Sequence, residues 1–169
     1  IGQVGDFTNY YAGNESYFDP TLWHNNEIKK YEGYCSDIFT DEALKFIEQN
    51  KSNQFFCYLS FNAPHTPLQV PEKYYDLYKD IDPSNFYEEV SSEMTERDVN
   101  DAKKIYGMVT NIDENFGKLL YKLEELDIKE NTIVIFLTDN GPQQTRYVSN
   151  LRGLKLSLIH ISEPTRQHA

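Results

Sequence analysis

Cysteine and long apolar runs are scarce in this 169-residue sequence, and each scarcity excludes a class of protein. The two cysteines, Cys35 and Cys57, are too few for a disulfide framework or a cysteine-based zinc site. No run approaches the roughly 18 apolar residues of a membrane-spanning helix. Glycine and proline are also modest, at 8 and 7 residues, beside 39% hydrophobic residues. This composition can form a core, and the length suits one domain or a piece of a larger one.

Positive charge is in short supply as well. The sequence has 16 Lys and Arg against 27 Asp and Glu, which gives a formal net charge of −11. A field of this sign repels phosphate backbones and tolerates hard divalent cations. We therefore expect no nucleic-acid partner.

The two ends of the sequence have unusual features. The chain starts at Ile1 with neither an initiator Met nor a signal-type segment, so the localisation stays open. The last residues, 156–169, resemble the in-frame translation of a transposase-type sequencing adapter. We therefore expect residues 1–155 to carry the fold and residues 156–169 to be a non-native tail, with a natural tail as the alternative.

Three segments carry the clearest structural patterns. Residues 55–61 and 131–138 are uninterrupted apolar and β-branched runs, typical of buried strands. Between them, residues 97–126 repeat apolar side chains at intervals of three and four, which predicts a long amphipathic helix. The order strand, helix, strand predicts two parallel strands joined by a right-handed crossover. The sequence therefore predicts an α/β fold.

Shorter elements flank these segments. Thr40 is a candidate N-cap for a helix ending near Asn50, and Tyr74–Asp80 predicts another short helix. Tyr10–Tyr34 shows no period and predicts an ordered surface excursion, whereas residues 62–71 contain three prolines and predict a rigid loop.

Polar residues follow both predicted strands at the edge where ligands bind in open α/β folds. His65 lies between Pro64 and Pro67, where an imidazole could donate to an anion or a leaving group. Asp139 and Asn140 offer a carboxylate and an amide oxygen to a divalent cation. An ordinary loop histidine and an ordinary Asx turn are the alternatives.

The motifs occur in a definite order over residues 10–155: Tyr31–Tyr34, Asp37–Ile47, Ala63–Pro67, Met108–Leu126, Thr138–Pro142 and Leu151–Lys155. This order resembles the sulfatase family, in its arylsulfatase-like branch. The resemblance implies an alkaline-phosphatase-like α/β/α sandwich, with residues 1–155 as a piece of the catalytic domain. It also implies hydrolysis of sulfate esters by a formylglycine nucleophile beside a divalent metal, usually Ca²⁺, with Mg²⁺ as the alternative.

The resemblance also implies roles for four residues. Asp139 and Asn140 match a pair of metal ligands, and His65 matches a histidine that contacts the sulfate. Lys155 matches a lysine that reaches the sulfate oxygens. A cation, an imidazole and an ammonium group can each stabilise the charge on the oxygens of a sulfuryl group in transfer.

The family's nucleophile motif, Cys-x-Pro/Ala-x-Arg, has no match here. Neither Cys35 nor Cys57 is followed by an arginine four residues later, and the early acidic metal ligands are missing too. We expect the formylglycine upstream of Ile1, and we expect this chain to be inactive by itself.

Two other readings stay open. One is a metal-dependent phosphodiesterase or phosphatase-type hydrolase of the same superfamily, and the other is a non-catalytic binding homologue. The sequence upstream of Ile1 distinguishes them. For the sulfatase reading, the expected partner is a sulfate-ester small molecule or a sulfated glycan.

Overall fold

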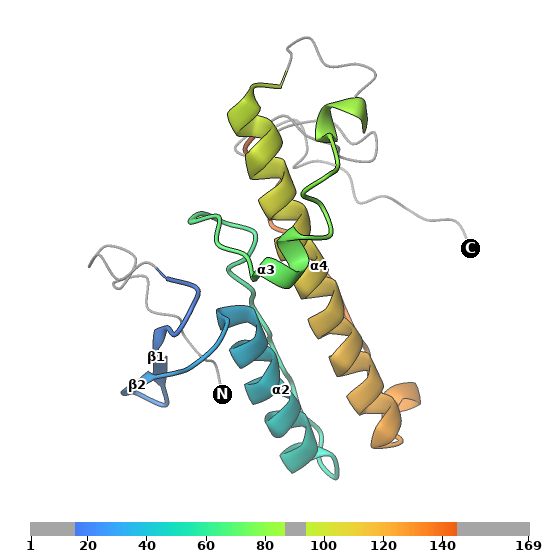
Figure 1. Ribbon diagram of the computed structural model, residues 1–169. Helices are drawn as coiled ribbons and strands as arrows, with labels where there is room; N and C mark the ends of the chain where they lie inside the picture. Colours follow the sequence, from blue (N-terminus) through green and yellow to red (C-terminus); the bar gives the residue numbers. More distant parts are fainter. Residues whose placement is uncertain (1–15, 87–93, 145–169) are drawn as a thin grey trace. The chain divides into compact units, whose positions relative to one another are not determined.

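The structure, a computed structural model, describes residues 16–86 and 94–144. In chain order its elements are β1 (Thr21–His24), β2 (Glu27–Lys30), α2 (Cys35–Asn50), α3 (Glu72–Tyr75), the 3-10 helix η1 (Pro83–Phe86), α4 (Glu96–Glu125) and the 3-10 helix η2 (Lys129–Asn131) (Figure 1). The chain divides into two compact units. The first comprises Ile1–Asp80 and Lys104–Ile133, and the second comprises Ile81–Lys103 and Val134–Ala169. Lys155 and the predicted tail, 156–169, lie outside the described residues.

The first unit begins with an antiparallel hairpin. β1 pairs with β2 in a register that sets His24 opposite Glu27. The two residues between them, Asn25 and Asn26, have φ angles of 52° and 67°. A two-residue hairpin turn of type I′ needs such left-handed conformations, and asparagine tolerates them. This part of the surface excursion expected over Tyr10–Tyr34 is therefore a hairpin, whose strands the missing period did not predict.

Helix α2 begins earlier than the sequence predicts. The predicted N-cap is Thr40, but the observed N-cap is Tyr34 and the helix runs over Cys35–Asn50. Thr40 is buried within the helix, and its Oγ1 donates to the carbonyl oxygen of Ser36 at 2.8 Å. Threonine inside a helix can satisfy its hydroxyl in this way, so a cap-like residue type alone does not mark a helix start. The predicted end near Asn50 is confirmed.

Helix α4 confirms the strongest periodic pattern in the sequence, since it covers Glu96–Glu125 against a predicted range of 97–126. Its start is a capping box. The backbone N–H of Asp98 donates to Thr95 Oγ1 at 3.2 Å, while the N–H and hydroxyl of Thr95 donate to Asp98 Oδ2 at 3.0 and 2.6 Å. These bonds to Thr95 lower the pKa of Asp98, so this contribution to stability is present above the ordinary carboxyl pKa and is lost as the pH falls.

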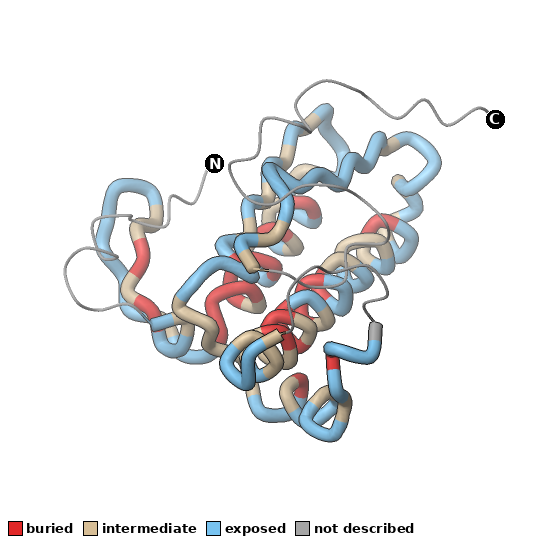
Figure 2. The backbone as a smooth tube through the Cα atoms, turned by 90° about the horizontal axis from the view of Figure 1, so that it is seen from above, coloured by how far each residue is buried: buried red, intermediate tan, exposed pale blue. Residues whose placement is uncertain are grey.

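Two small apolar clusters form the core of the first unit. One consists of Leu22, Cys35, Ile38 and Phe39. The other joins Ala63 to Met108 and Ile112 of α4. Tyr17 packs at the edge of both clusters. Figure 2 shows that buried positions concentrate along α2 and α4, whereas most loop positions are exposed.

The two predicted parallel strands are not confirmed. Burial alternates along residues 55–61, which is the period of an extended chain covered on one side. Residues 133–137 are all exposed, and Leu137 is 81% exposed. A strand needs a neighbour for its backbone hydrogen bonds, and within residues 16–86 and 94–144 the pair β1–β2 is the only sheet. The crossover role of α4 between parallel strands therefore stays a prediction. The short helix predicted at Tyr74–Asp80 is observed slightly earlier, as α3.

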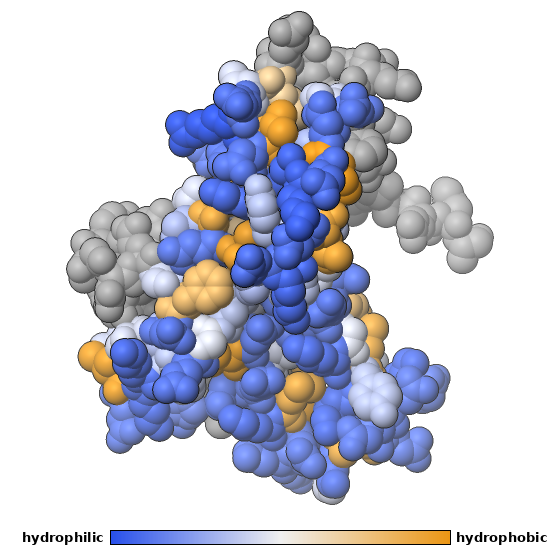
Figure 3. Space-filling view, in the orientation of Figure 1, coloured by the Kyte–Doolittle hydropathy of each residue, from blue (hydrophilic) through white to orange (hydrophobic). Residues whose placement is uncertain are grey.

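Polar and charged side chains cover most of the face drawn in Figure 3, where apolar side chains form small separate patches. Among the helices in the described ranges, none is both long and apolar enough to cross a membrane.

Gly107 lies where α4 passes close to the segment around α3. A Cβ at this position would lie 2.9 Å from Val70 Cγ2 and 3.1 Å from the backbone carbonyl carbon and oxygen of Tyr74. Gly117, farther along the same helix, has no atom within 4 Å of the corresponding point. The same substitution should therefore have opposite effects at these two positions.

We expect Gly117→Ala to stabilise the protein by up to about 1 kcal/mol, the helix preference of alanine over glycine. Gly107→Ala gains the same preference, but overpacking costs about 1–3 kcal/mol, and the backbone of Tyr74 cannot rotate away. We expect a net destabilisation of about 1 kcal/mol. Urea unfolding midpoints at equal m-values test the pair. A midpoint for Gly107→Ala at or above that of Gly117→Ala would contradict the close contact.

Candidate functional site

His65 lies in a proline-flanked turn that follows the extended residues 55–61. Its backbone N–H donates to the carbonyl oxygen of Asn62 at 3.0 Å and closes the turn. Ala63, inside the turn, is 7% exposed and packs against Met108 and Ile112 of α4. The turn that carries His65 is thus attached to the long helix by a buried methyl group.

The imidazole of His65 is oriented by its own neighbour. Nδ1 lies 2.8 Å from the carbonyl oxygen of Thr66, and 3.3 Å from Thr66 Oγ1. A carbonyl oxygen can only accept, so this contact assigns a proton to Nδ1. Nε2 then accepts when the ring is neutral and donates when the ring is protonated. Only the protonated ring can offer an N–H to an anionic oxygen through Nε2.

Two tyrosines form hydrogen bonds to the loop of residues 62–71 that carries His65, here called the histidine loop. The hydroxyl of Tyr17 donates to the carbonyl oxygen of His65 at 3.1 Å, and the N–H of Tyr17 donates to Gln69 Oε1 at 2.6 Å. The hydroxyl of Tyr34 donates to the carbonyl oxygen of Gln69 at 2.9 Å. Burial raises the pKa of Tyr34, so its hydroxyl stays protonated and remains a donor. Both ends of the loop are therefore fixed by hydrogen bonds.

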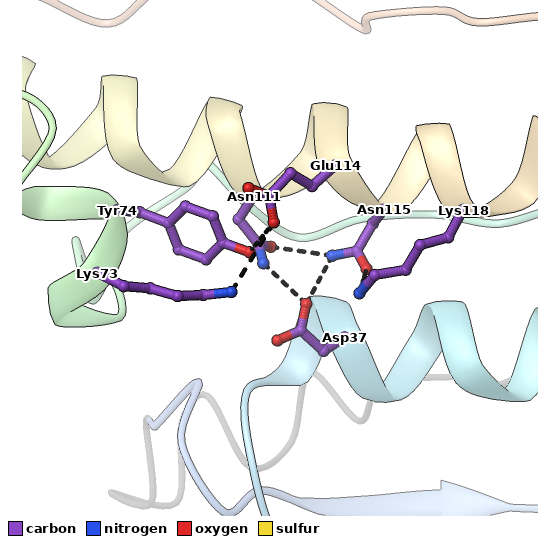
Figure 4. Close-up of polar contacts among 7 residues, drawn as sticks. All are labelled: Asp37, Lys73, Tyr74, Asn111, Glu114, Asn115 and Lys118. Atoms are coloured by element: carbon purple, nitrogen blue, oxygen red, sulfur yellow. Dashed lines mark hydrogen bonds and ion pairs between the residues drawn. The ribbon is translucent and has the colours of Figure 1, made fainter.

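A buried polar cluster joins α2 to α4 (Figure 4). Asp37 Oδ1, in the first turn of α2, accepts from Asn111 Nδ2 at 2.8 Å and from Asn115 Nδ2 at 2.7 Å. Both asparagines are 0% exposed. Asn115 Nδ2 also donates to Asn111 Oδ1 at 3.2 Å, and Lys118 Nζ donates to Asn115 Oδ1 at 2.9 Å. The buried amides are satisfied, so the cluster fixes the start of α2 against the middle of α4.

A second polar group lies beside this cluster (Figure 4). The hydroxyl of Tyr74 donates to Glu114 Oε2 at 2.6 Å. Lys73 Nζ lies 3.8 Å from the same carboxylate oxygen and 4.3 Å from the centre of the Tyr74 ring. These contacts tie α3 to α4, which positions the segment that follows the histidine loop.

Asp139 and Asn140 lie in an exposed bend in the second unit. The hydroxyl of Thr138 donates to the carbonyl oxygen of Asn140 at 3.2 Å and closes the bend. The two side chains are neighbours by sequence. His65 belongs to the first unit, so its convergence with this pair on one edge of a sheet stays a prediction. Lys155 lies outside the described residues.

The donor set of Asp139 and Asn140 suits a hard cation, because Ca²⁺ and Mg²⁺ prefer carboxylate and carbonyl-type oxygens. Ca²⁺ takes about six to eight oxygen ligands, so this pair is a partial set. In the part of the chain that the structure describes, no group of three or more His, Cys, Asp or Glu could hold a metal ion. The oxygen atoms of Asp139 and Asn140 therefore suit Ca²⁺ or Mg²⁺ chemically, but these two residues do not make a complete set of ligands.

The cysteines have structural surroundings. Cys35 is 5% exposed in the apolar cluster at the start of α2, and burial raises the pKa of its thiol to about 12. The half-buried Cys57 also has its thiol pKa raised by burial. A protonated thiol is a poor nucleophile. This agrees with the absence of the nucleophile motif around either residue.

An open groove of about 420 Å³ lies beside the histidine loop. Its walls include Phe18, Tyr75, Glu72 and Lys104, together with the loop residues Leu68–Val70. Phe18 follows the anchoring residue Tyr17 directly. The groove therefore combines aromatic surface, one carboxylate and one ammonium group next to the segment that carries His65.

Sequence reasoning missed the residues that hold the loop and the helices. One available signal was in the α4 pattern, where Asn111 and Asn115 are four residues apart on the apolar stripe marked by Met108 and Ile112. Two amides on such a stripe require a buried polar partner. The partner, Asp37, is 74 and 78 residues away in sequence, so local patterns do not identify it.

The family model described as Sulfatase matches residues 3–160 of this chain. The chain is 32% identical over 169 aligned residues to an arylsulfatase of Clostridium perfringens (strain 13 / Type A), covering 83% of this chain and 35% of that protein. It is 29% identical over 124 residues to an ulvan-active sulfatase of Formosa agariphila, covering 69% of this chain and 23% of that protein. The chain thus spans about a quarter to a third of the length of these relatives.

A solved structure has a similar backbone. The structure of Ps i-CgsB in complex with k-i-k-neocarrahexaose aligns with a TM-score of 0.60 and 29% identity, over 81% of this chain and 28% of that one. At this level of similarity the matched part shares its fold with that protein.

Proposed function

This chain belongs to the sulfatase family, and from that premise we propose that the complete protein hydrolyses sulfate esters. The observation that carries the proposal furthest within this chain is the His65 turn. Its imidazole is oriented through Nδ1, and its backbone is held by Tyr17. Both restraints keep the exposed imidazole in one place, as a donor to developing charge requires.

His65 and Lys155 are the proposed sulfate contacts. Negative charge develops on the leaving oxygen and sits on the sulfuryl oxygens during transfer, so donors fixed in advance lower the barrier. The Nδ1–H of His65 donates to the carbonyl oxygen of Thr66, so the proposed hydrogen bond to the sulfate would come from Nε2–H of the protonated ring. Lys155 would contribute a second positive charge.

Asp139 and Asn140 are the proposed metal ligands, with Ca²⁺ as the expected ion and Mg²⁺ as the alternative. When bound, the cation would supply Lewis-acid polarisation of the sulfate oxygens. The remaining ligands and the formylglycine nucleophile are expected in other parts of the complete protein. The buried, protonated thiol of Cys35 supports this division, because it is unsuited to attack a sulfate ester.

The proposed substrate class is a sulfated glycan. Relatives point this way, since one is an ulvan-active sulfatase and a protein of the same fold was solved with k-i-k-neocarrahexaose. The groove beside the histidine loop supports the same class. Phe18 and Tyr75 offer faces for a sugar ring, and Lys104 offers a cation to a further anionic substituent.

The test is an assay of the complete protein with Ca²⁺ on 4-nitrophenyl sulfate and 4-nitrophenyl phosphate, with sulfate hydrolysis expected to prevail. Asp139→Ala should raise the Ca²⁺ concentration for half-maximal activity by more than the roughly tenfold seen for outer ligand-shell changes, because a charged ligand is lost. The matched control is Asp80→Ala, an exposed carboxylate of the first unit, which should leave the Ca²⁺ requirement unchanged. Preference for the phosphate ester would favour the phosphatase-type alternative.

A further inference from the structure

We propose that Tyr17 is a positioning residue for His65, whose hydroxyl fixes the histidine backbone and through it the placement of Nε2. This inference rests on the proposed role of His65 as a sulfate contact. It assigns to Tyr17 an effect on catalysis that is separate from the stability of the fold.

Tyr17 is itself held at several points. Its carbonyl oxygen accepts from the N–H of Cys35, the first residue of α2, at 2.7 Å. Its N–H donates to Gln69 Oε1 at 2.6 Å, and its ring meets the ring of Tyr34 edge-on with centres 6.1 Å apart. The start of α2 is fixed in turn to α4 through Asp37. Tyr17 therefore links the histidine loop to the start of α2, which Asp37 joins to α4.

The hydroxyl of Tyr17 reaches the loop at the residue whose placement matters. It donates to the carbonyl oxygen of His65 at 3.1 Å. That carbonyl belongs to the peptide unit between His65 and Thr66, and the next carbonyl, of Thr66, orients Nδ1 at 2.8 Å. Only one residue separates the anchored oxygen from the oxygen that orients the ring. A shift of this peptide unit would move Nε2 directly.

Small shifts at such a position have large kinetic effects, because a donor must sit where charge develops in the transition state. The substitution Tyr17→Phe removes the hydroxyl but keeps the ring, which packs at the edge of both apolar clusters. It also keeps the backbone bonds to Gln69 and Cys35. A kinetic loss without a matching loss of stability is therefore the expected signature.

The experiment is a double-mutant cycle in the complete protein with an aryl sulfate as the probe. Tyr17→Phe should lower kcat by about tenfold, less than the roughly 10²-fold that a 1 Å misplacement can cause. In the His65→Ala background the same substitution should have no further effect on kcat, because no imidazole is left to position. Thermal unfolding should be nearly unchanged. The matched control is Tyr78→Phe, which removes a hydroxyl bonded to Thr110 Oγ1 at 2.6 Å and should leave kcat unaltered.

The outcomes separate two kinds of failure. An equal loss of kcat from Tyr17→Phe in both backgrounds would overturn the positioning role, since the hydroxyl would then act independently of His65. Unchanged kcat in Tyr17→Phe, with a large loss in His65→Ala, would also overturn it and would leave the proposed function intact. Unchanged kcat in His65→Ala would overturn the proposed sulfate contact itself, and the positioning role with it.

Discussion

Replacing His65 by alanine in the complete protein should lower kcat for sulfate-ester hydrolysis by about 10²- to 10³-fold, the usual effect of removing one fixed donor to developing charge. Lys155→Ala should have an effect of the same order, because an ammonium group at the sulfate serves the same electrostatic purpose. His65→Ala should change the unfolding midpoint little, since the His65 side chain is exposed. Steady-state kinetics with an aryl sulfate measure the effect.

A second histidine provides the control. His24 in β1 lies 2.6 Å from the hydroxyl of Tyr31 through Nδ1, and 3.9 Å from Glu42 Oε2. These contacts are local to the hairpin and the middle of α2, so His24→Ala should leave kcat unchanged. A loss of kcat in His24→Ala as large as in His65→Ala would mean that the assay reports damage to the fold and not the loss of a sulfate contact.

Replacing Asp37 by alanine should destabilise the fold by about 2–3 kcal/mol, because it removes the acceptor of the buried Asn111 Nδ2 and one of the two acceptors of Asn115 Nδ2. Asn111 and Asn115 are both 0% exposed and cannot turn to water. Asp37→Asn keeps one oxygen acceptor at the same place, so it should cost less, about 1 kcal/mol. Urea unfolding of the complete protein at constant m-value measures both variants.

The control for Asp37 is Asp41 on the same helix. Asp41 is exposed, and its replacement by alanine should change stability by no more than about 0.5 kcal/mol. If Asp37→Ala were no more destabilising than Asp41→Ala, the amides of Asn111 and Asn115 would have other acceptors and the cluster would not join α2 to α4.

The helices were the most predictable part of this chain. The range of α4 follows from spacing alone, because its apolar residues keep a helical period over most of its 30 residues. The capping box formed by Thr95 and Asp98 was not predicted, although a threonine and an aspartate three residues apart are its sequence signal. For α2 the period gave the helix and its end, but the start was misplaced because Thr40 resembles a cap and is instead buried.

The sheet and the site were less predictable, since both depend on partners distant in sequence. The runs at 55–61 and 131–138 have strand composition, but composition does not supply the neighbouring strands that make a ladder. The hairpin was detectable from Asn25 and Asn26, two residues that accept left-handed φ angles. Positions after the predicted strands singled out His65, Asp139 and Asn140, and the resemblance to sulfatases implied their roles. The contact from Tyr17 to His65 spans 48 residues and needed coordinates.

The exposed segment 133–137 has a consequence for the colloidal behaviour of this chain by itself. It is a β-branched, uncharged run of the kind that stacks into intermolecular sheets when it is unpaired. The charged residues Glu130 and Asp139 flank this run. They oppose its stacking, because stacked identical segments would bring like charges together. High salt screens the charges of these carboxylates. Self-association through this segment is therefore favoured at high ionic strength and resisted at low ionic strength.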